Sequence, residues 1–70
     1  MLRFTRHARN RMRRDRVDEE DVRHCIDEAE ARIASIKGRT NYSRRYREGT
    51  LRVTAIEEDG DQVVITVTLI

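Results

Sequence analysis

The chain has 70 residues, of which 40% are charged, with a net charge of only +2 and a single cysteine. A chain of this length forms one domain at most and hides only about 60% of the surface that its unfolded form exposes, so we expect a partner, or a second copy as in a homodimer, to add burial. One cysteine excludes an internal disulfide, and no run approaches the ~18 apolar residues of a membrane span. We therefore expect a cytoplasmic protein without membrane contact.

The charges fall in alternating blocks along the chain. Residues 1–16 carry +6, residues 17–31 carry −6, residues 32–52 carry +6 and residues 53–70 carry −4. If the two basic blocks meet in space, they create a strong local field despite the small net charge. All but one of the basic residues are arginines, which suit bidentate phosphate contacts. The pattern thus indicates an anionic polymer as ligand; the alternative is a solvated surface that serves solubility.

The first helix is expected to run from Thr5, a good N-cap residue, to about Asp15. Its apolar stripe consists of Phe4, Ala8 and Met12. This stripe is expected to face the core. Residues next to it lie at the edge of the core, where packing orients their side chains and solvent still reaches them.

Three polar residues lie beside that stripe. His7, Arg11 and Arg14 stand at positions i, i+4 and i+7, so a helix places them on one side. A titratable group among fixed cations is typical of a site that binds or cleaves phosphate. Two alternatives use the same residues. His7 can lie in the buried seam with its ring bonded to a backbone carbonyl, and the two arginines can pair with the acidic second helix.

The second helix is well marked. Asp18 is the expected N-cap, acidic residues follow at 19–21, and Val17 with Val22 occupy the positions of a hydrophobic staple. The helix is expected to end near Ala31. Its expected core positions, at helical spacing, are Val22, Cys25, Ile26, Ala29 and Ile33.

The pair His24 and Cys25 is no zinc site in this interpretation. Two further ligands are missing, and adjacent residues on a helix point apart. Cys25 is expected to be a small buried residue and His24 to face solvent. We accordingly expect no metal ion and no cofactor.

After the second helix the period changes to that of strands, with turn signals at Lys37-Gly38, Glu48-Gly49 and Asp59-Gly60. The predicted fold is α+β, a single domain over residues 1–70, with two N-terminal helices packed on one face of a three- to four-stranded antiparallel sheet. The expected strands are Arg32–Lys37, Asn41–Arg47, Thr50–Glu57 and Gln62–Leu69.

The last two strands alternate between an apolar face and a face rich in threonine and arginine. A three-residue loop over residues 58–60, which pairs Val53 with Ile65, keeps these faces separate, whereas a two-residue loop would mix them. The preceding strand is ambiguous. One turn at Gly49 sends Tyr42, Arg44 and Tyr46 to the polar face, and the other sends Arg45 there.

The chain resembles a known family over nearly all of its length, from its first two helices to the glycine turns and the terminal Val-Ile-Thr-Val. Residues 4–17 read Phe-Thr-Arg-His-Ala-Arg-Asn-Arg-Met-Arg-Arg-Asp-Arg-Val, and Asp-Glu-Glu-Asp-Val follows. This stretch is similar to small bacterial proteins of a domain-of-unknown-function family grouped with the BrnT and RelE toxins. One departure is Arg16, where the family often has a glycine. The resemblance implies a barnase/EndoU/colicin/RelE-type fold with an RNA-cleaving sheet face.

Metal-free RNA cleavage needs a base, an acid and cations that stabilise the charge on phosphorus. Together with the resemblance, this predicts a toxin-type ribonuclease with RNA as substrate and an antitoxin protein as partner. The alternative is a non-catalytic module that binds nucleic acid or protein. The expected catalytic residues are His7, Arg11, Tyr46 and Thr66, and the expected substrate-binding residues are Arg14, Arg44 and Arg45.

Overall fold

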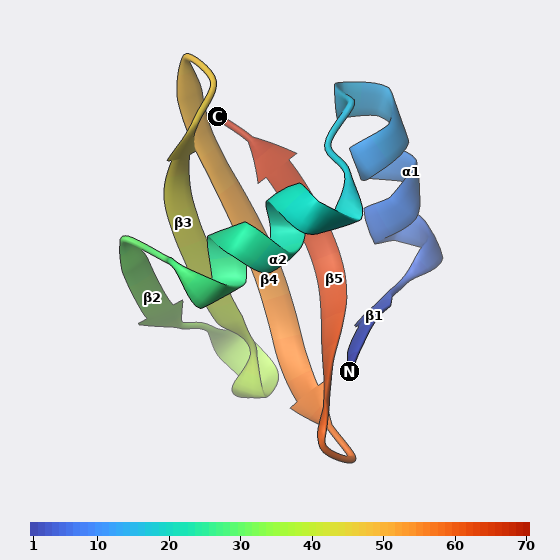
Figure 1. Cartoon of the computed structure of the whole chain (residues 1–70). Coiled ribbons are helices and arrows are strands. Elements are labelled where there is room, and N and C mark those ends of the chain that lie inside the picture. The colour runs from blue at the N-terminus through green and yellow to red at the C-terminus, as the bar shows by residue number, and fades with distance from the viewer.

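The computed structural model describes residues 1–70 as two helices and one five-stranded sheet (Figure 1). The strand order is β1-β5-β4-β3-β2, and every neighbouring pair is antiparallel except β1 and β5, which are parallel. No helix is long and apolar enough to cross a membrane. The elements are β1 (Leu2–Phe4), α1 (Arg6–Asp15), α2 (Glu19–Asp27), β2 (Ala31–Ala34), β3 (Thr40–Tyr46), β4 (Gly49–Glu58) and β5 (Asp61–Leu69), with a 3-10 turn at Ile36–Gly38.

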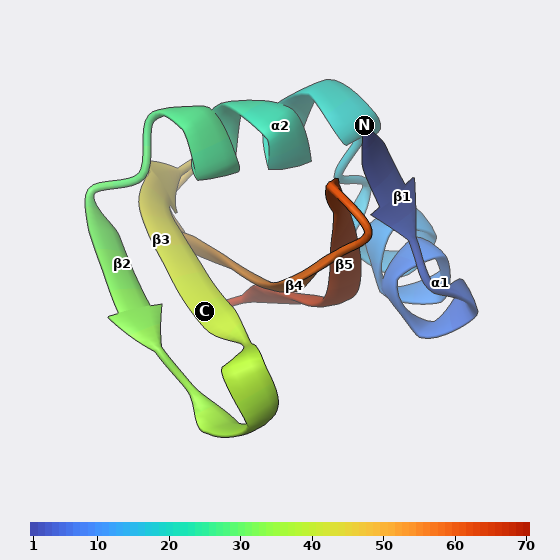
Figure 2. The same ribbon diagram turned by 90° about the horizontal axis from the view of Figure 1, so that it is seen from below.

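The predicted α+β class is confirmed, but the predicted sheet and the placement of the helices are wrong in detail. The sheet has five strands and is mixed, because the three residues of β1 add a parallel edge strand beside β5. Only α2 covers a face of the sheet, where it packs against β3 and β4. Since β1 leads the chain to the sheet edge, α1 continues from there and packs along β5 (Figure 2).

Both helices begin where the sequence predicts. The Thr5 hydroxyl accepts the Ala8 amide at 3.1 Å, and Asp18 forms a capping box at the start of α2. Between them, Arg16 adopts the left-handed conformation, with φ 57° and ψ 46°, and its amide bonds back into α1. Such a helix end favours glycine, because a residue with a Cβ adopts the left-handed conformation at a cost.

The second helix is shorter than predicted, and this changes the place of Ile33. The helix ends at Asp27 rather than near Ala31, and the chain then enters β2. Ile33 lies on that edge strand with 61% of its surface exposed, so its predicted role in the core is wrong. The four-residue strand pairs with β3 only, so its outer backbone edge is free.

The hairpin between β4 and β5 closes with two residues, not three. Asp59 and Gly60 both have positive φ angles, 52° and 82°, the combination that a type I′ turn requires. The predicted pairing of Val53 with Ile65 is therefore wrong. Ile65 is a bulge residue without a cross-strand partner, and Val53 pairs with Val67. The bulge shifts the register by one residue and so puts the buried Val64 and Val67 on the same face, while Val63 lies on the opposite face.

The sheet therefore has two different faces. We call the face under α2 the helical face and the opposite one the open face. Figure 2 shows the sheet curving around α2, so the helical face is concave and the open face is convex. The β3–β4 register sends Arg45 to the open face and Tyr42, Arg44 and Tyr46 to the helical face. The core lies on the helical face and consists of Ala8, Met12, Val17, Val22, Cys25, Tyr42, Leu51, Val53, Ala55, Val64 and Val67.

Candidate functional site

The first turn of α1 is fixed on β5 and directs His7 to the open face. The Thr5 amide donates to the Val64 carbonyl at 3.0 Å, and the Thr5 hydroxyl donates to the Ile65 carbonyl at 2.9 Å. Two residues further on, His7 Nε2 lies 3.1 Å from the Thr66 hydroxyl. His7 is exposed, and its ring meets a threonine of the sheet rather than a backbone carbonyl between the helices.

The arginines of α1 divide between the two sides of the helix. Arg9 lies on the side of α2, where it pairs with Glu19 at 3.0 Å and covers the Phe4 ring at 4.8 Å. Arg11 and Arg14 lie on the His7 side by helical spacing. The salt bridge to the acidic helix is thus made by Arg9, and the alternative that Arg11 and Arg14 serve this role is wrong.

Arg11 and Arg14 differ in their own partners. Arg14 pairs with its neighbour Asp15 at 3.4 Å, at an exposed position. Arg11 is partly buried, and its Nε is a buried side-chain nitrogen without a hydrogen-bond partner. A buried donor that lacks an acceptor costs about 1–3 kcal/mol. Arg11 therefore places a cation one turn along the helix from His7, but its Nε is closed to solvent and cannot itself meet a phosphate.

A row of polar groups crosses the open face from His7. On β5, Thr66 stands opposite Thr54 of β4, which in turn stands opposite Asn41 of β3. The Thr54 hydroxyl donates to Asn41 Oδ1 at 2.6 Å. We call His7, Thr66, Thr54 and Asn41 the hydroxyl row; it spans α1 and three neighbouring strands.

A second row carries positive charge. Arg52 of β4 is exposed and stands between Thr68 of β5 and Ser43 of β3. We assign Arg11 to this row as well, because it follows His7 by one helical turn and α1 packs along β5. We call Arg11, Thr68, Arg52 and Ser43 the arginine row. Arg45 follows on β3, opposite Thr50.

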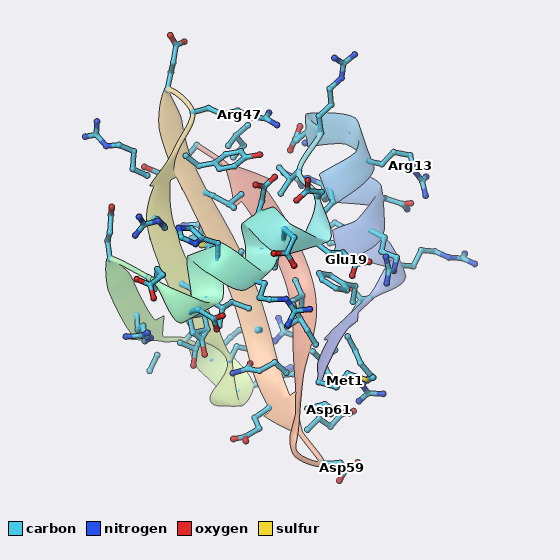
Figure 3. The ribbon with its side chains drawn as sticks, viewed as in Figure 1. Met1, Arg13, Glu19, Arg47, Asp59 and Asp61 are labelled. Atoms are coloured by element: carbon cyan, nitrogen blue, oxygen red, sulfur yellow. The ribbon has the colours of Figure 1, made fainter.

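No carboxylate lies in either row. The strand carboxylates of the open face are Glu58 and Asp61 at its far end, and Arg3 pairs with them at 3.2 and 3.5 Å. Figure 3 shows Arg47 near the β3–β4 turn, and Asp59 and Asp61 near the β4–β5 turn at the other end of the molecule.

Tyr46, a predicted catalytic residue, lies on the helical face, away from His7. Its hydroxyl donates to Asp21 Oδ2 at 2.7 Å. Burial raises the pKa of Tyr46, and the hydrogen bond to the Asp21 carboxylate raises it further. Burial acts in the same direction on the pKa of Asp21, but the hydrogen bonds from Tyr46 and Asp18 outweigh it and leave that pKa below its ordinary value. This pair attaches β3 to the start of α2.

Two arginines near the helical face hold the ends of the helices. Arg44, a predicted substrate-binding residue, donates to the Glu28 carbonyl at 2.6 Å and so satisfies the end of α2. Arg47 stacks on the Tyr46 ring at 4.7 Å and donates to the carbonyls of Asp15 and Arg16 at the end of α1. Their donors are used within the fold, so the structure separates Arg44 from the predicted phosphate contacts.

Cys25 is buried on the helical face, as predicted. It is 1% exposed, and its Sγ lies 3.7 and 3.6 Å from the carbonyls of Tyr42 and Leu51. Burial raises the pKa of the thiol to about 11, so the thiolate is scarce at neutral pH. The thiol therefore packs as a small apolar group.

The structure brings His7, Thr66 and Arg45 to the open face, with Arg11 one helical turn beyond His7, and adds residues that the sequence prediction left out. Alternation had placed Arg52 and Thr54 on a polar face, but nothing in that pattern set them apart from other exposed residues. Asn41 depends on the β3 register, which the sequence left open.

The fold and this site define an α+β protein with a helix-covered sheet whose second face carries hydroxyl groups, arginines and one histidine. The sequence matches, over residues 4–68, the family described as "Domain of unknown function (DUF4258)", and the chain belongs to this family. Searches of the curated proteins and of the solved structures give no match.

Proposed function

We propose that the protein is a ribonuclease of toxin type that cleaves RNA on the open face without a metal ion. The observation that carries the proposal is the 3.1 Å contact between His7 Nε2 and the Thr66 hydroxyl, on a sheet face whose two rows hold arginine and hydroxyl groups and no carboxylate. Imidazole exchanges protons near neutral pH, and guanidinium groups bind phosphate oxygens, so the two groups supply complementary parts of phosphodiester cleavage.

The reaction would proceed by attack of the ribose 2′ oxygen on phosphorus. His7 accepts the 2′ hydroxyl proton, the new bond closes a cyclic phosphate, and the bond from phosphorus to the 5′ oxygen breaks. Arg11 stabilises the negative charge that develops on the phosphoryl oxygens. Because Tyr46 lies on the other face, the leaving 5′ oxygen takes its proton from water or from the protonated His7 in this scheme.

Thr66 acts as a positioning residue in this proposal. Its hydroxyl engages Nε2 of His7, which leaves Nδ1 as the ring nitrogen without a partner in the fold. In this scheme Nε2–H donates to the Thr66 hydroxyl, which fixes the orientation of the imidazole and leaves Nδ1 unprotonated to accept the 2′ hydroxyl proton. Thr66→Val is therefore expected to lower the cleavage rate, and Thr66→Ser, which keeps the hydroxyl, to restore most of it.

A second candidate function is binding without catalysis through the same face. The position of Tyr46 favours it, because cleavage needs an acid as well as a base and the open face offers one titratable side chain in the two rows. Such a module binds nucleic acid or a protein partner. Phosphate-driven binding falls steeply as the salt concentration rises, because counterions are released.

The resemblance to a domain-of-unknown-function family that is grouped with the BrnT and RelE toxins supports the catalytic candidate and implies an antitoxin. We propose an acidic antitoxin segment that covers the open face, because the arginine row offers complementary charge there. A second copy of the chain is the other proposed partner. It would pair at the free edge of β2, where Ile33 is exposed.

The test compares two histidine variants on a defined RNA in EDTA. His7→Ala removes the imidazole of the open face, and His24→Ala removes an exposed imidazole of α2 as a matched control. We expect the wild type and His24→Ala to cleave, and His7→Ala to be at least about 100-fold slower. Intact RNA with all three proteins would exclude the ribonuclease proposal, and equal cleavage by His7→Ala would exclude its role.

A further inference from the structure

We infer that the open face recognises the backbone of a double-helical RNA stem, and that the nucleotide presented to His7 lies just beyond the end of that stem. The inference rests on the proposal that RNA is the ligand of this face, and it adds the class of RNA and the way in which it docks. Three features of the face carry it: the absence of aromatic rings, the curvature and the kind of polar groups.

The open face has no aromatic side chain. The chain has three aromatic residues. Phe4 packs against the core under Arg9, Tyr42 is buried under α2, and Tyr46 bonds to Asp21. Proteins that bind single-stranded RNA stack its bases on aromatic rings, and each stacked base contributes about 1–3 kcal/mol. The open face cannot hold unpaired bases in this way.

The convex curvature of the open face favours a ligand with a concave surface. Because the sheet curves around α2, its open face bulges outwards along the hydroxyl and arginine rows (Figure 2). A convex face cannot enclose a flexible single strand. It fits into a wide, shallow groove, and the minor groove of an A-form RNA helix has this shape.

The polar groups of the two rows match what that groove presents. The A-form minor groove displays 2′ hydroxyls between two lines of phosphates. The face offers the hydroxyls of Thr54, Thr68 and Ser43 together with the exposed guanidinium of Arg52. Threonine and serine hydroxyls both donate and accept hydrogen bonds, so they suit 2′ hydroxyls, and the guanidinium suits phosphate. These contacts read RNA shape rather than base sequence.

The place of His7 decides where such an RNA would be cut. His7 comes from α1 at the β5 edge of the sheet, whereas Arg52 and Thr54 lie on its central strand. Attack by a 2′ oxygen needs alignment with the leaving 5′ oxygen, and the stacked, paired nucleotides of a regular helix resist that rearrangement. A stem centred on β4 therefore presents its flanking, unpaired nucleotide to the histidine at the rim.

The test measures binding separately from cleavage. The His7→Ala variant, which is not expected to cleave, is titrated with an RNA hairpin, with an unpaired RNA of the same length and composition, and with a DNA hairpin of the same sequence. We expect the RNA hairpin to bind about tenfold more tightly than the other two. Arg52→Gln is expected to weaken hairpin binding and to lower the salt slope by about 1, whereas Arg23→Gln on α2, with the same change in charge, leaves both unchanged.

Equal affinity for the hairpin and the unpaired RNA, or for RNA and DNA hairpins, would overturn the inference, as would equal effects of the two arginine substitutions. Cleavage mapping with the wild type supplies the second readout. We expect cuts within a few nucleotides of the stem end, and cuts spread evenly over unpaired RNA would contradict the docking scheme. Hairpin binding without any cutting would leave this inference standing and remove the proposed ribonuclease activity.

Discussion

The two faces of the sheet are built from alternate residues of the same strands, yet their polar groups are used differently. On the helical face, Tyr46 and Arg44 bond to groups of α2 and serve the fold. On the open face, His7 touches one hydroxyl, Arg52 is exposed, and Arg11 has a buried nitrogen without an acceptor. The same residue types thus occur on both faces. A polar side chain whose hydrogen bonds are made within the protein serves the fold, and one that lacks such partners is a candidate for ligand binding.

Arg44 and Arg45 are neighbours in the sequence and show the same difference between the two faces. Arg44 points under α2 and donates to the carbonyl at its end, whereas Arg45 stands on the open face opposite Thr50. The sequence presents them as equivalent members of one basic block. They lie on different faces because successive side chains of a strand point to opposite sides of the sheet.

The largest expected difference between the faces is in stability. Leu51→Ala, on the helical face at 1% exposure, is expected to lower the free energy of unfolding by about 2–5 kcal/mol, through lost burial and the cavity left behind. Thr54→Val, on the open face, loses one partly buried hydrogen bond and is expected to cost at most about 1 kcal/mol. Urea unfolding measures both, and similar losses would contradict the division of roles.

Tyr46→Phe tests the attachment of β3 to α2. Loss of the bond to Asp21 is expected to cost about 1 kcal/mol at neutral pH. The pKa of Asp21 is lowered in the folded state, so the stability it contributes is present above the ordinary carboxyl pKa near ~4 and is lost as the pH falls through the lowered value. The variant should therefore show a weaker acid dependence of the free energy of unfolding below about pH 4.

The same variant also separates the two faces in activity. We expect Tyr46→Phe to cleave RNA like the wild type once it is folded, because its hydroxyl lies on the helical face. Cleavage lost by a variant that is shown by circular dichroism to be folded would place Tyr46 in the site after all.

Much of the fold could be predicted from local chemistry. Thr5 and Asp18 predict the helix starts, because their side chains accept hydrogen bonds from free backbone amides. The alternation in β4 and β5 predicts a sheet with one apolar and one polar face. The short β1 could not be predicted, because three residues carry no period. The bulge at Ile65 could not be predicted either. A bulge and a longer loop both shift the pairing of the two strands by one residue, so the sequence pattern does not distinguish them.

The candidate site was predicted in part for a similar reason. Helical spacing put His7 and Arg11 on one side of α1, and alternation put Thr66 on the polar face of the last strand, where it meets His7. The face on which Tyr46 and Arg44 lie depends on the register of β3. That register depends on the length of the turn near Gly49, which the sequence left open. The pairing of Arg9 with Glu19 depends on how two helices cross, which spacing within one helix does not specify.

The central claim is that the open face, and not the helical face, meets the ligand. Backbone amide chemical-shift mapping of the His7→Ala variant with an RNA hairpin tests it most directly. The predicted result is a set of shifts confined to the open-face rows, at Thr66, Thr54 and Arg52, with α2 unchanged. Shifts that cluster on α2 and around Tyr46 instead would contradict the account.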